Sequence, residues 1–353
     1  MPVVSAPVVV LPRHQVTTDE LMERIEELYA DHPKIRQIRR VMRATTVRTR
    51  CYTRPLAEQF GVPSSLAERA RAHLRECLDL AERAAEQALL ETGLDPGEIN
   101  GLVVLSSTGH SLPGLDVPLM DRLGLPRSVR RVPVSQVGCA GGVFALARAL
   151  DLMAAGRDSR VLVVCVDAFS HYLHGADTGL DGMILKGLFG DAAGACVVRS
   201  EAAGPRMELL RAWEYVHPDT HGTVGTYVDG DGLHGFNSPK LQRVVREAMP
   251  LVTDWLERTA PPGCDPAPRF VVSHTGGPRI LDAFVEGLGC HPDMVDLARD
   301  SLRELGNVGS VSVLDVLQRT FAKSPAEGDR GLLLAAGPGV TFVAVQAVWR
   351  SWS

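Results

Sequence analysis

The sequence contains an internal duplication, and this repeat constrains the fold more than any other feature. In residues 99–125 and again in 267–290, an apolar strand is followed by Ser-x-Thr-Gly, a proline and a helix ending in Leu-Gly. A second stretch follows each of these at a similar distance, and GCAGGV at 138–143 corresponds to GNVGSV at 306–311. Strands alternating with helices predict an α/β fold built from two similar units. We expect an N-terminal half at 1–205 and a C-terminal half at 206–353.

The duplication also predicts where the reactive side chains lie. Two similar βα units related by a pseudo-twofold axis bring corresponding helix starts face to face at the centre of the molecule. One of these helix starts carries Cys139 and the other carries Asn307. At the ends of two strands, Ser107 in the first half corresponds to His274 in the second. Unlike side chains from equivalent positions are therefore expected around one cavity.

Cys139, His274 and Asn307 have the chemistry of a nucleophilic acyl-transfer site. Cys139 begins a helix, where the helix dipole and unpaired N–H groups favour a thiolate. His274 is expected to pair with that thiolate or to donate through Nε2, and Asn307 offers an amide donor for a thioester oxyanion. The other six cysteines fit an inert role. Three glycines are expected to leave room for a substrate to approach the backbone: Gly138, Gly141 and Gly142.

Composition excludes several classes of partner. The 353 residues are 45% hydrophobic, so the chain can bury a large core. A net charge of -5 and 5% aromatic residues give no basis for binding nucleic acid. No apolar run in the sequence is long enough to predict a membrane span. The seven cysteines stand singly without a CxxC pair, which is typical of a cytoplasmic protein and predicts no metal site.

Five motifs, in order along the chain, give the sequence a resemblance to a known family: QVGCAGG, GLFGDAAGACVV, SHTGGPRILD, GNVGS and AAGPGVT. Together they resemble the type III polyketide synthases, the chalcone synthase-like branch of the thiolase superfamily. The resemblance implies a five-layered αβαβα fold, a homodimer, and iterative decarboxylative condensation of malonyl-CoA onto an acyl-CoA starter. It further implies cyclisation to a small pyrone or resorcinol-like product, with no cofactor beyond the CoA thioesters.

The resemblance also implies roles for individual residues. Cys139 becomes the acyl-accepting nucleophile, while His274 and Asn307 stabilise the enolate left when malonyl loses carbon dioxide, and His274 also maintains the thiolate. Phe189 corresponds to a gate between the CoA tunnel and the cavity, and Leu112 to a residue that reaches into the partner subunit's cavity. A second gate falls on Gly235 or Phe236, depending on the alignment. The remaining cavity positions are Ser107, Tyr172, Thr226 and Gly309.

A basic run before residue 55 is expected to bind the phosphates of CoA. From this run the resemblance assigns Arg43 and Arg48. The same patch suits an acyl carrier protein, whose surface is acidic, so delivery of the starter by CoA or by carrier protein stays open. The cations of the run are Lys34, Arg36, Arg39, Arg40, Arg43, Arg48 and Arg50.

Three other functions compete with a polyketide synthase. A 3-oxoacyl-ACP synthase III also uses Cys, His and Asn, but its histidine is typically followed by Gln-Ala-Asn, whereas His274 is followed by Thr-Gly-Gly-Pro. A papain-like hydrolase has the three residues in the same order but lacks the duplication. A non-catalytic partner of a condensing enzyme is expected to have lost the nucleophile, and Cys139 is present.

Overall fold

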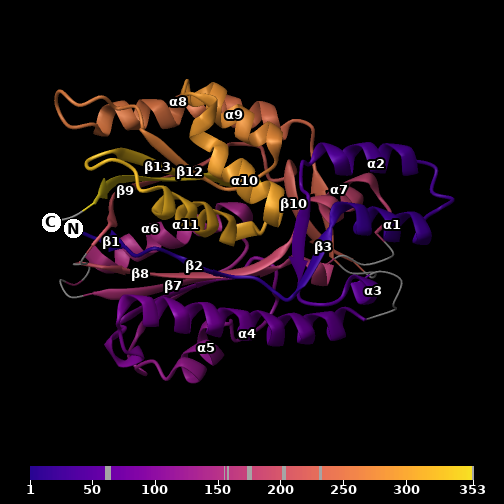
Figure 1. The fold of residues 1–353 in the computed structure, drawn as a ribbon, viewed down its shortest axis with the longest axis horizontal. Helices are drawn as coiled ribbons and strands as arrows, with labels where there is room; N and C mark the ends of the chain where they lie inside the picture. Colours follow the sequence, from indigo (N-terminus) through magenta and orange to yellow (C-terminus); the bar gives the residue numbers. More distant parts are fainter. Residues whose placement is uncertain are drawn as a thin grey trace.

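The computed structural model describes residues 1–59, 65–154, 156, 159–172, 177–200, 204–229 and 233–351, without the side chains of residues 172, 228 and 233. Within this part of the chain, helices and strands stack in five layers (Figure 1). Helices α4 (Leu66–Thr92) and α5 (Asp116–Leu123) cover one face, and α8 (Leu241–Thr259) and α9 (Pro278–Leu288) cover the opposite face. Helices α6 (Gly141–Ala154) and α11 (Ser312–Lys323) form the central layer. The predicted αβαβα fold is confirmed.

The strand order confirms that the two halves repeat one topology. In the N-terminal half the order is β5 (Gly101–Leu105), β7 (Arg160–Ala168), β8 (Asp191–Arg199) and β2 (Val8–Val10). In the C-terminal half it is β12 (Phe270–Ser273), β13 (Arg330–Gly337), β14 (Thr341–Arg350) and β9 (Arg206–Val216). The first pair of each set is parallel and the later pairs are antiparallel. The predicted division at 205/206 stays a prediction, and β9 begins there.

Two short features mark where the halves join and differ. Strand β1 (Val3–Val4) pairs with both β8 and β9 and so links the two halves by backbone hydrogen bonds. Strand β6 (Arg130–Val134) extends the N-terminal half beside β5. At the equivalent place in the other half, residues 289–298 contain no strand but the turn Pro292–Val295, which packs on β12.

Burial explains why the inner elements form as they do. Every residue of β8 except its last is buried, because helices cover both faces of the sheet. Strands buried on both faces are continuous apolar runs instead of alternating ones. Helix α6 is apolar on nearly all sides because it lies between the two sheets. The bodies of the two halves therefore share one core around α6 and α11.

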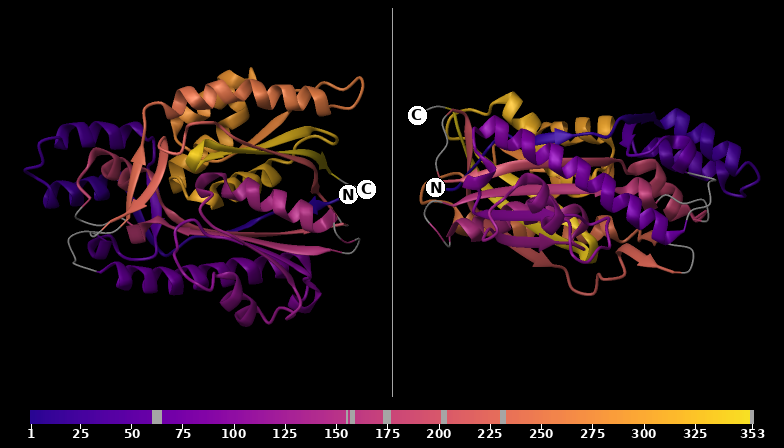
Figure 2. Two further views of the ribbon diagram at one scale, coloured as in Figure 1. Left: turned by 180° about the vertical axis from the view of Figure 1, so that it is seen from behind. Right: turned by 90° about the horizontal axis from the view of Figure 1, so that it is seen from below.

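Smaller elements extend from the layers at the end away from β1 (Figure 2). Helix α1 (Thr18–Leu28) has a capping box, in which Thr17 and Glu20 exchange hydrogen bonds. Helix α2 (Ile35–Ala44) packs against α7 (Leu180–Leu188). The remaining elements of this region are β3 (His14–Thr17), β4 (Thr49–Tyr52), α3 (Leu56–Gln59), β10 (Val224–Val228) and β11 (Leu233–Asn237). Helix α10 (Asp296–Leu305) lies beside α9 and α11. No helix of the described residues is long and apolar enough to cross a membrane.

Candidate active site

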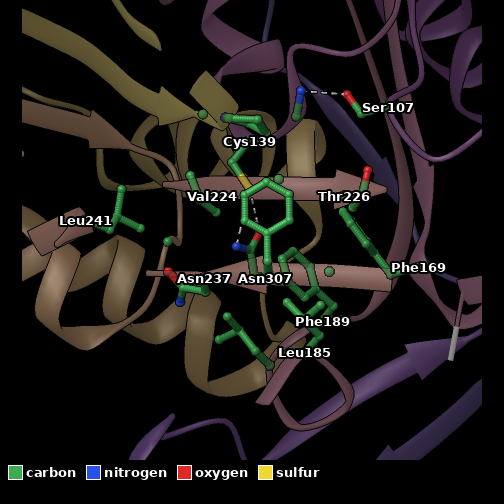
Figure 3. A pocket seen from close by; sticks show the side chains of 18 of the residues that line it. Ser107, Cys139, Phe169, Leu185, Phe189, Val224, Thr226, Asn237, Leu241 and Asn307 are labelled. Atoms are coloured by element: carbon green, nitrogen blue, oxygen red, sulfur yellow. Dashed lines mark hydrogen bonds between the residues drawn. The ribbon is translucent and has the colours of Figure 1, made fainter. Parts of the chain in front are cut away.

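A cavity of about 530 Å³ opens where the two halves meet, and it is lined by residues of both. The three predicted chemical groups lie in its wall: Cys139, His274 and Asn307. Asn307 Nδ2 lies 3.5 Å from Cys139 Sγ, as the dashed line in Figure 3 shows. The prediction that the corresponding helix starts meet at the centre is therefore confirmed. Ser107 and His274, which follow β5 and β12, also line this cavity.

Local backbone bonds fix the orientation of the Asn307 amide. Its Oδ1 accepts a hydrogen bond of 2.9 Å from the N–H of Gly309 and a longer one of 3.7 Å from the Cys139 thiol, and Nδ2 is the atom nearer the sulfur. Gly309 has φ +60°, and a Cβ there would lie 2.5 Å from Asp167 Oδ2. Gly309 is buried and is not one of the residues that line the cavity. The prediction that it shapes the cavity wall is wrong, because it supports Asn307 from behind.

His274 is held as a neutral hydrogen-bond donor. Its Nδ1 accepts from the N–H of Ala336 at 3.3 Å, which places the ring proton on Nε2. Burial lowers the pKa of His274 to about 4. A Cβ on Gly276 would lie 2.5 Å from Nε2, so the missing side chain at 276 keeps this nitrogen uncovered. The geometry therefore suits donation to a substrate oxygen. Among the described residues the ring accepts from Ala336 and forms no hydrogen bond with Cys139.

Cys139 lies in a single turn, Gly138–Ala140, that leads directly into α6. Its position at a helix start is as predicted, but the expected thiolate is not supported. Burial raises the pKa of Cys139 to about 11, although the hydrogen bond from Asn307 acts in the opposite direction. Loss of water around the sulfur outweighs the effect of the helix dipole.

The glycines around Cys139 serve packing more than substrate access. A Cβ on Gly142 would lie 2.3 Å from the carbonyl oxygen of Ser310, so α6 approaches the Asn307 turn as closely as backbones allow. Gly141 packs in the same way between Leu105 and Ser310. Of the three glycines, Gly138 alone lines the cavity. The prediction that all three make room for a substrate is therefore wrong for the other two.

Most of the remaining predicted positions line the cavity. Phe189 stacks on Phe169 with ring centroids 4.1 Å apart, and Figure 3 shows both rings below Cys139. Ser107 and Thr226 are also in the wall, and so are both candidates for the second gate, Gly235 and Phe236. The Tyr172 side chain lies outside the described part of the chain.

The basic run and Leu112 lie outside the cavity wall of this chain, and one cation of the run is buried. Arg43 and Arg48 are exposed and do not line the cavity. Arg50, which belongs to the same basic run, is fully buried. Its guanidinium donates to Thr18 Oγ1 and to the Gly187 carbonyl. Successive side chains of a strand point to opposite faces, so one cation of the run is turned into the core by β4. A count of charges in the sequence does not show which cation this is. Leu112 is fully exposed, while the leucines at 115 and 119 are buried in this chain's own core.

Sequence reasoning missed many wall residues, among them Phe169, Leu185 and Lys186. Phe169 and Leu185 carry no motif and are recognisable only from the cavity they line. Lys186 is buried in the same wall, where its ammonium donates to the carbonyl of Asp177 and burial lowers its pKa to about 8. The one sequence feature that indicates this residue is a lysine within the otherwise apolar run of α7.

Comparison with known proteins agrees with this geometry. Models of the N-terminal and C-terminal domains of chalcone and stilbene synthases match residues 6–202 and 215–351. A phloroglucinol synthase from Pseudomonas fluorescens is 31% identical over 349 residues, which cover 99% of each chain. Two solved structures from Streptomyces coelicolor are each 29% identical to this chain and match it over 99% of both chains. One is 1,3,6,8-tetrahydroxynaphthalene synthase, a bacterial type III polyketide synthase, with a TM-score of 0.93. The other is germicidin synthase, with a TM-score of 0.91. The chain belongs to the chalcone and stilbene synthase family, the type III polyketide synthases.

Proposed function

We propose that this polyketide synthase loads an acyl group onto Cys139 and extends it repeatedly with malonyl-CoA, then releases a cyclised pyrone or resorcinol-like product. The observation that supports the proposal is the convergence of a thiol, an amide donor and an Nε2–H donor on one cavity. The chemistry needs CoA thioesters and groups of this chain, so the proposal includes no metal or other cofactor. Because CoA thioesters are cytoplasmic metabolites, it also places the enzyme in the cytoplasm.

The loading step is a thioester exchange. The sulfur of Cys139 bonds to the carbonyl carbon of the starter, the bond from that carbon to the CoA sulfur breaks, and the thiol proton leaves with CoA. Asn307 Nδ2 is already directed at the sulfur, so it is in place to donate to the oxygen that becomes negative beside it. The neutral form of Cys139 means that proton removal accompanies the attack instead of preceding it.

The extension step begins with decarboxylation of malonyl-CoA. Nε2–H of His274 and Nδ2–H of Asn307 would both donate to the thioester oxygen as the carboxylate leaves as carbon dioxide. The resulting enolate carbon attacks the acyl carbonyl on Cys139, the carbon–sulfur bond breaks, and the lengthened chain remains on CoA. Both donors stay uncharged at neutral pH, so neither requires a counter-ion in the buried wall.

We further propose that the enzyme is a homodimer in which Leu112 enters the partner's cavity. Leu112 is fully exposed on the loop that leads into α5, where a second copy of the chain would cover it. Arg43 and Arg48 are proposed to attract the phosphates of CoA from outside the cavity. Both are exposed, and neither forms an ion pair within the described residues.

Product analysis tests this function directly. The protein is incubated with malonyl-CoA and a panel of aliphatic and aromatic acyl-CoA starters, and the products are identified by mass spectrometry. Repeated two-carbon extension followed by loss of water supports the proposal, whereas a single condensation would contradict it. The variant Cys139→Ala is expected to lose covalent acyl loading while still releasing carbon dioxide from malonyl-CoA. Retained acyl loading in that variant would show that another residue is the nucleophile.

A further inference from the structure

Asp167, near the end of β7, is a buried carboxylate that contacts both halves of the active site. Its exposed fraction is 0%, and it lies directly behind the turns that carry Cys139 and Asn307. One oxygen accepts from the N-terminal half and the other accepts from the C-terminal half. No other acidic side chain of the described residues accepts hydrogen bonds from both Ser107 and Ser310.

The first oxygen supports the nucleophile. Oδ1 accepts from the N–H of Ser107 at 2.7 Å and from Thr108 Oγ1 at 3.3 Å. Ser107 Oγ in turn accepts from the N–H of Gly138 at 2.9 Å, a bond drawn in Figure 3. Gly138 immediately precedes Cys139, so the position of the sulfur is linked to Asp167 through one serine side chain.

The second oxygen supports the amide donor. Oδ2 accepts from the N–H of Ser310 at 2.9 Å and from Ser310 Oγ at 2.6 Å. The preceding residue, Gly309, donates its N–H to Asn307 Oδ1 and packs against Oδ2 of Asp167. The orientation of Asn307 is thus linked to the same carboxylate from the other side.

This arrangement is costly, which argues for a use beyond folding. Asp167 forms no ion pair with any described residue, and burial raises its pKa to about 6 in spite of its four hydrogen bonds. The charge of Asp167 acts on the thiols of Cys77, Cys139 and Cys165, which are neutral and supply no compensating charge. A buried charge without a counter-ion is disfavoured, so a neutral side chain would give a more stable core.

We propose that Asp167 is a positioning residue that holds the Cys139 turn and the Asn307 turn at their working separation by accepting hydrogen bonds from both. It touches neither the substrate nor the reacting atoms. The inference rests on the proposed function, because the two turns need a fixed separation only if both act on one thioester. A charged acceptor is required because all four groups bonded to the carboxylate are donors, and they come from Ser107, Thr108 and Ser310. A neutral amide would point its own N–H groups at the donors on one side.

The main test compares Asp167→Asn with a matched control. Asp191→Asn removes another fully buried carboxylate, which accepts from Ser170 and Thr53 and has no hydrogen bond to the active-site turns. We expect Asp167→Asn to lower kcat for malonyl-CoA decarboxylation by about 10²-fold with little change in KM, since displacements near 1 Å cost about that much. We expect the control to lose thermal stability but to keep its kcat per folded molecule.

Alkylation of Cys139 by iodoacetamide tests whether the sulfur of the folded variant keeps its reactivity while catalysis slows. The negative charge of Asp167 raises the pKa of Cys139, so removing it should leave the alkylation rate of the folded variant at or above that of the wild type. Slow catalysis with undiminished alkylation is therefore the expected pattern. A folded Asp167→Asn protein with wild-type kcat would overturn the proposal. If the wild type itself released no carbon dioxide, the proposed function would fail instead.

Single-arm variants keep the proposal testable if Asp167→Asn does not fold. Ser107→Ala removes the link to Gly138, so it should slow acyl loading of Cys139 more than decarboxylation. Ser310→Ala removes one bond on the Asn307 side, so it should slow decarboxylation more than loading. Equal effects of both variants on both steps, or no effect of either, would contradict a two-armed role for Asp167.

Discussion

At the scale of single residues, burial decides the protonation states in this site more than local charges do. The three buried groups Cys139, His274 and Asp167 all shift toward their neutral forms. A site that starts with neutral donors can stabilise a negative oxygen without first losing an ion pair. This also explains why Asn307, which cannot titrate, is suited to its place opposite the sulfur.

The shift at His274 gives a prediction about stability and pH. Its folded pKa of about 4 lies below its ordinary value of 6.5, so the unfolded chain takes up a proton between these values and the folded chain does not. His274 therefore lowers the free energy of unfolding as pH falls, by roughly 2 kcal/mol at about pH 5. Asp167 acts in the opposite direction below about pH 6, because its folded pKa is raised.

A variant isolates the histidine contribution from the others. His274→Gln lacks the titration but retains Asp167 and every other acid. Urea unfolding of both proteins between about pH 7 and pH 5 should show the wild type losing stability relative to the variant as pH decreases. Parallel pH profiles for the two proteins would mean that His274 is not held neutral by burial.

Asn307 provides a second prediction at this scale. Removing one oxyanion donor costs on the order of 10²–10³ in rate, so Asn307→Ala should slow malonyl-CoA decarboxylation by about that factor. Release of carbon dioxide from labelled malonyl-CoA measures this step without any starter. Asn237→Ala, a change at another asparagine of the cavity wall, is the matched control and should reduce decarboxylation much less. Similar losses in both variants would mean that Asn307 has no special part in the step.

The duplication predicted the reactive residues because it fixed which positions correspond. Cys139 and Asn307 begin equivalent helices, and two related halves must place these helix starts together. The protonation of Cys139 was not predictable, because burial depends on residues that the fold brings in from both halves. The role of Gly309 was also missed, since a glycine beside a cavity motif looks the same in sequence whether it faces the cavity or the core.

At the scale of elements, helix α7 and the ribbon β10–β11 form an adjustable part of the cavity wall. A Cβ on Gly235 of β11 would lie 1.9 Å from Leu185 Cδ1 of α7, so the leucine occupies the space that the glycine leaves. Phe236, the next residue, lies instead against Gly225 of the paired strand. The sequence did not decide whether residue 235 or residue 236 is the second gate, and both residues line the cavity.

This packing predicts a change in specificity. Gly235→Ala must push Leu185 from its position, which narrows the cavity and should favour short starters, whereas Leu185→Ala should admit longer ones. Because one methylene in a fitted pocket is worth about ten- to two-hundred-fold, shifts of that size in starter preference are expected. Competition between starters of different length measures them. Combining the two changes should return preference toward the wild type, since the residues are in contact.

Gly222→Ala is the matched control, because a Cβ there meets no atom within 4 Å. It tests whether replacing a glycine in this region changes specificity by itself. An unchanged starter preference in Gly235→Ala, with the control also unchanged, would place the contact with Leu185 outside the substrate's path.

At the scale of the whole molecule, the fold was predictable and the surface was not. Repeated strand and helix patterns are enough to predict two equivalent halves, and buried apolar runs such as β8 are enough to predict that helices cover both sheet faces. The burial of Arg50 and the isolation of Leu112 on the surface depend on how loops and short strands turn, which periodicity does not record.

The proposed dimer predicts a hydrodynamic mass. Sedimentation at low micromolar concentration should give about twice the chain mass of 38.1 kDa. Leu112→Trp is expected to remain dimeric if the residue enters a cavity, because the cavity provides space that a flat interface does not. A monomer with full activity would contradict both the dimer and the shared cavity.

The same residue allows the shared cavity itself to be tested by complementation. In a Leu112→Trp homodimer each cavity would receive a tryptophan, so chain growth should meet the wall earlier and shorter products should be released. Co-expression with Cys139→Ala, which makes no extended product alone, gives mixed dimers. In these, the one cavity with an intact nucleophile belongs to the Leu112→Trp chain but receives the unaltered Leu112 of its partner. Products of wild-type length should therefore reappear. If the mixed dimers yield only short products, residue 112 acts on its own chain's cavity, and the proposed exchange across the interface is wrong.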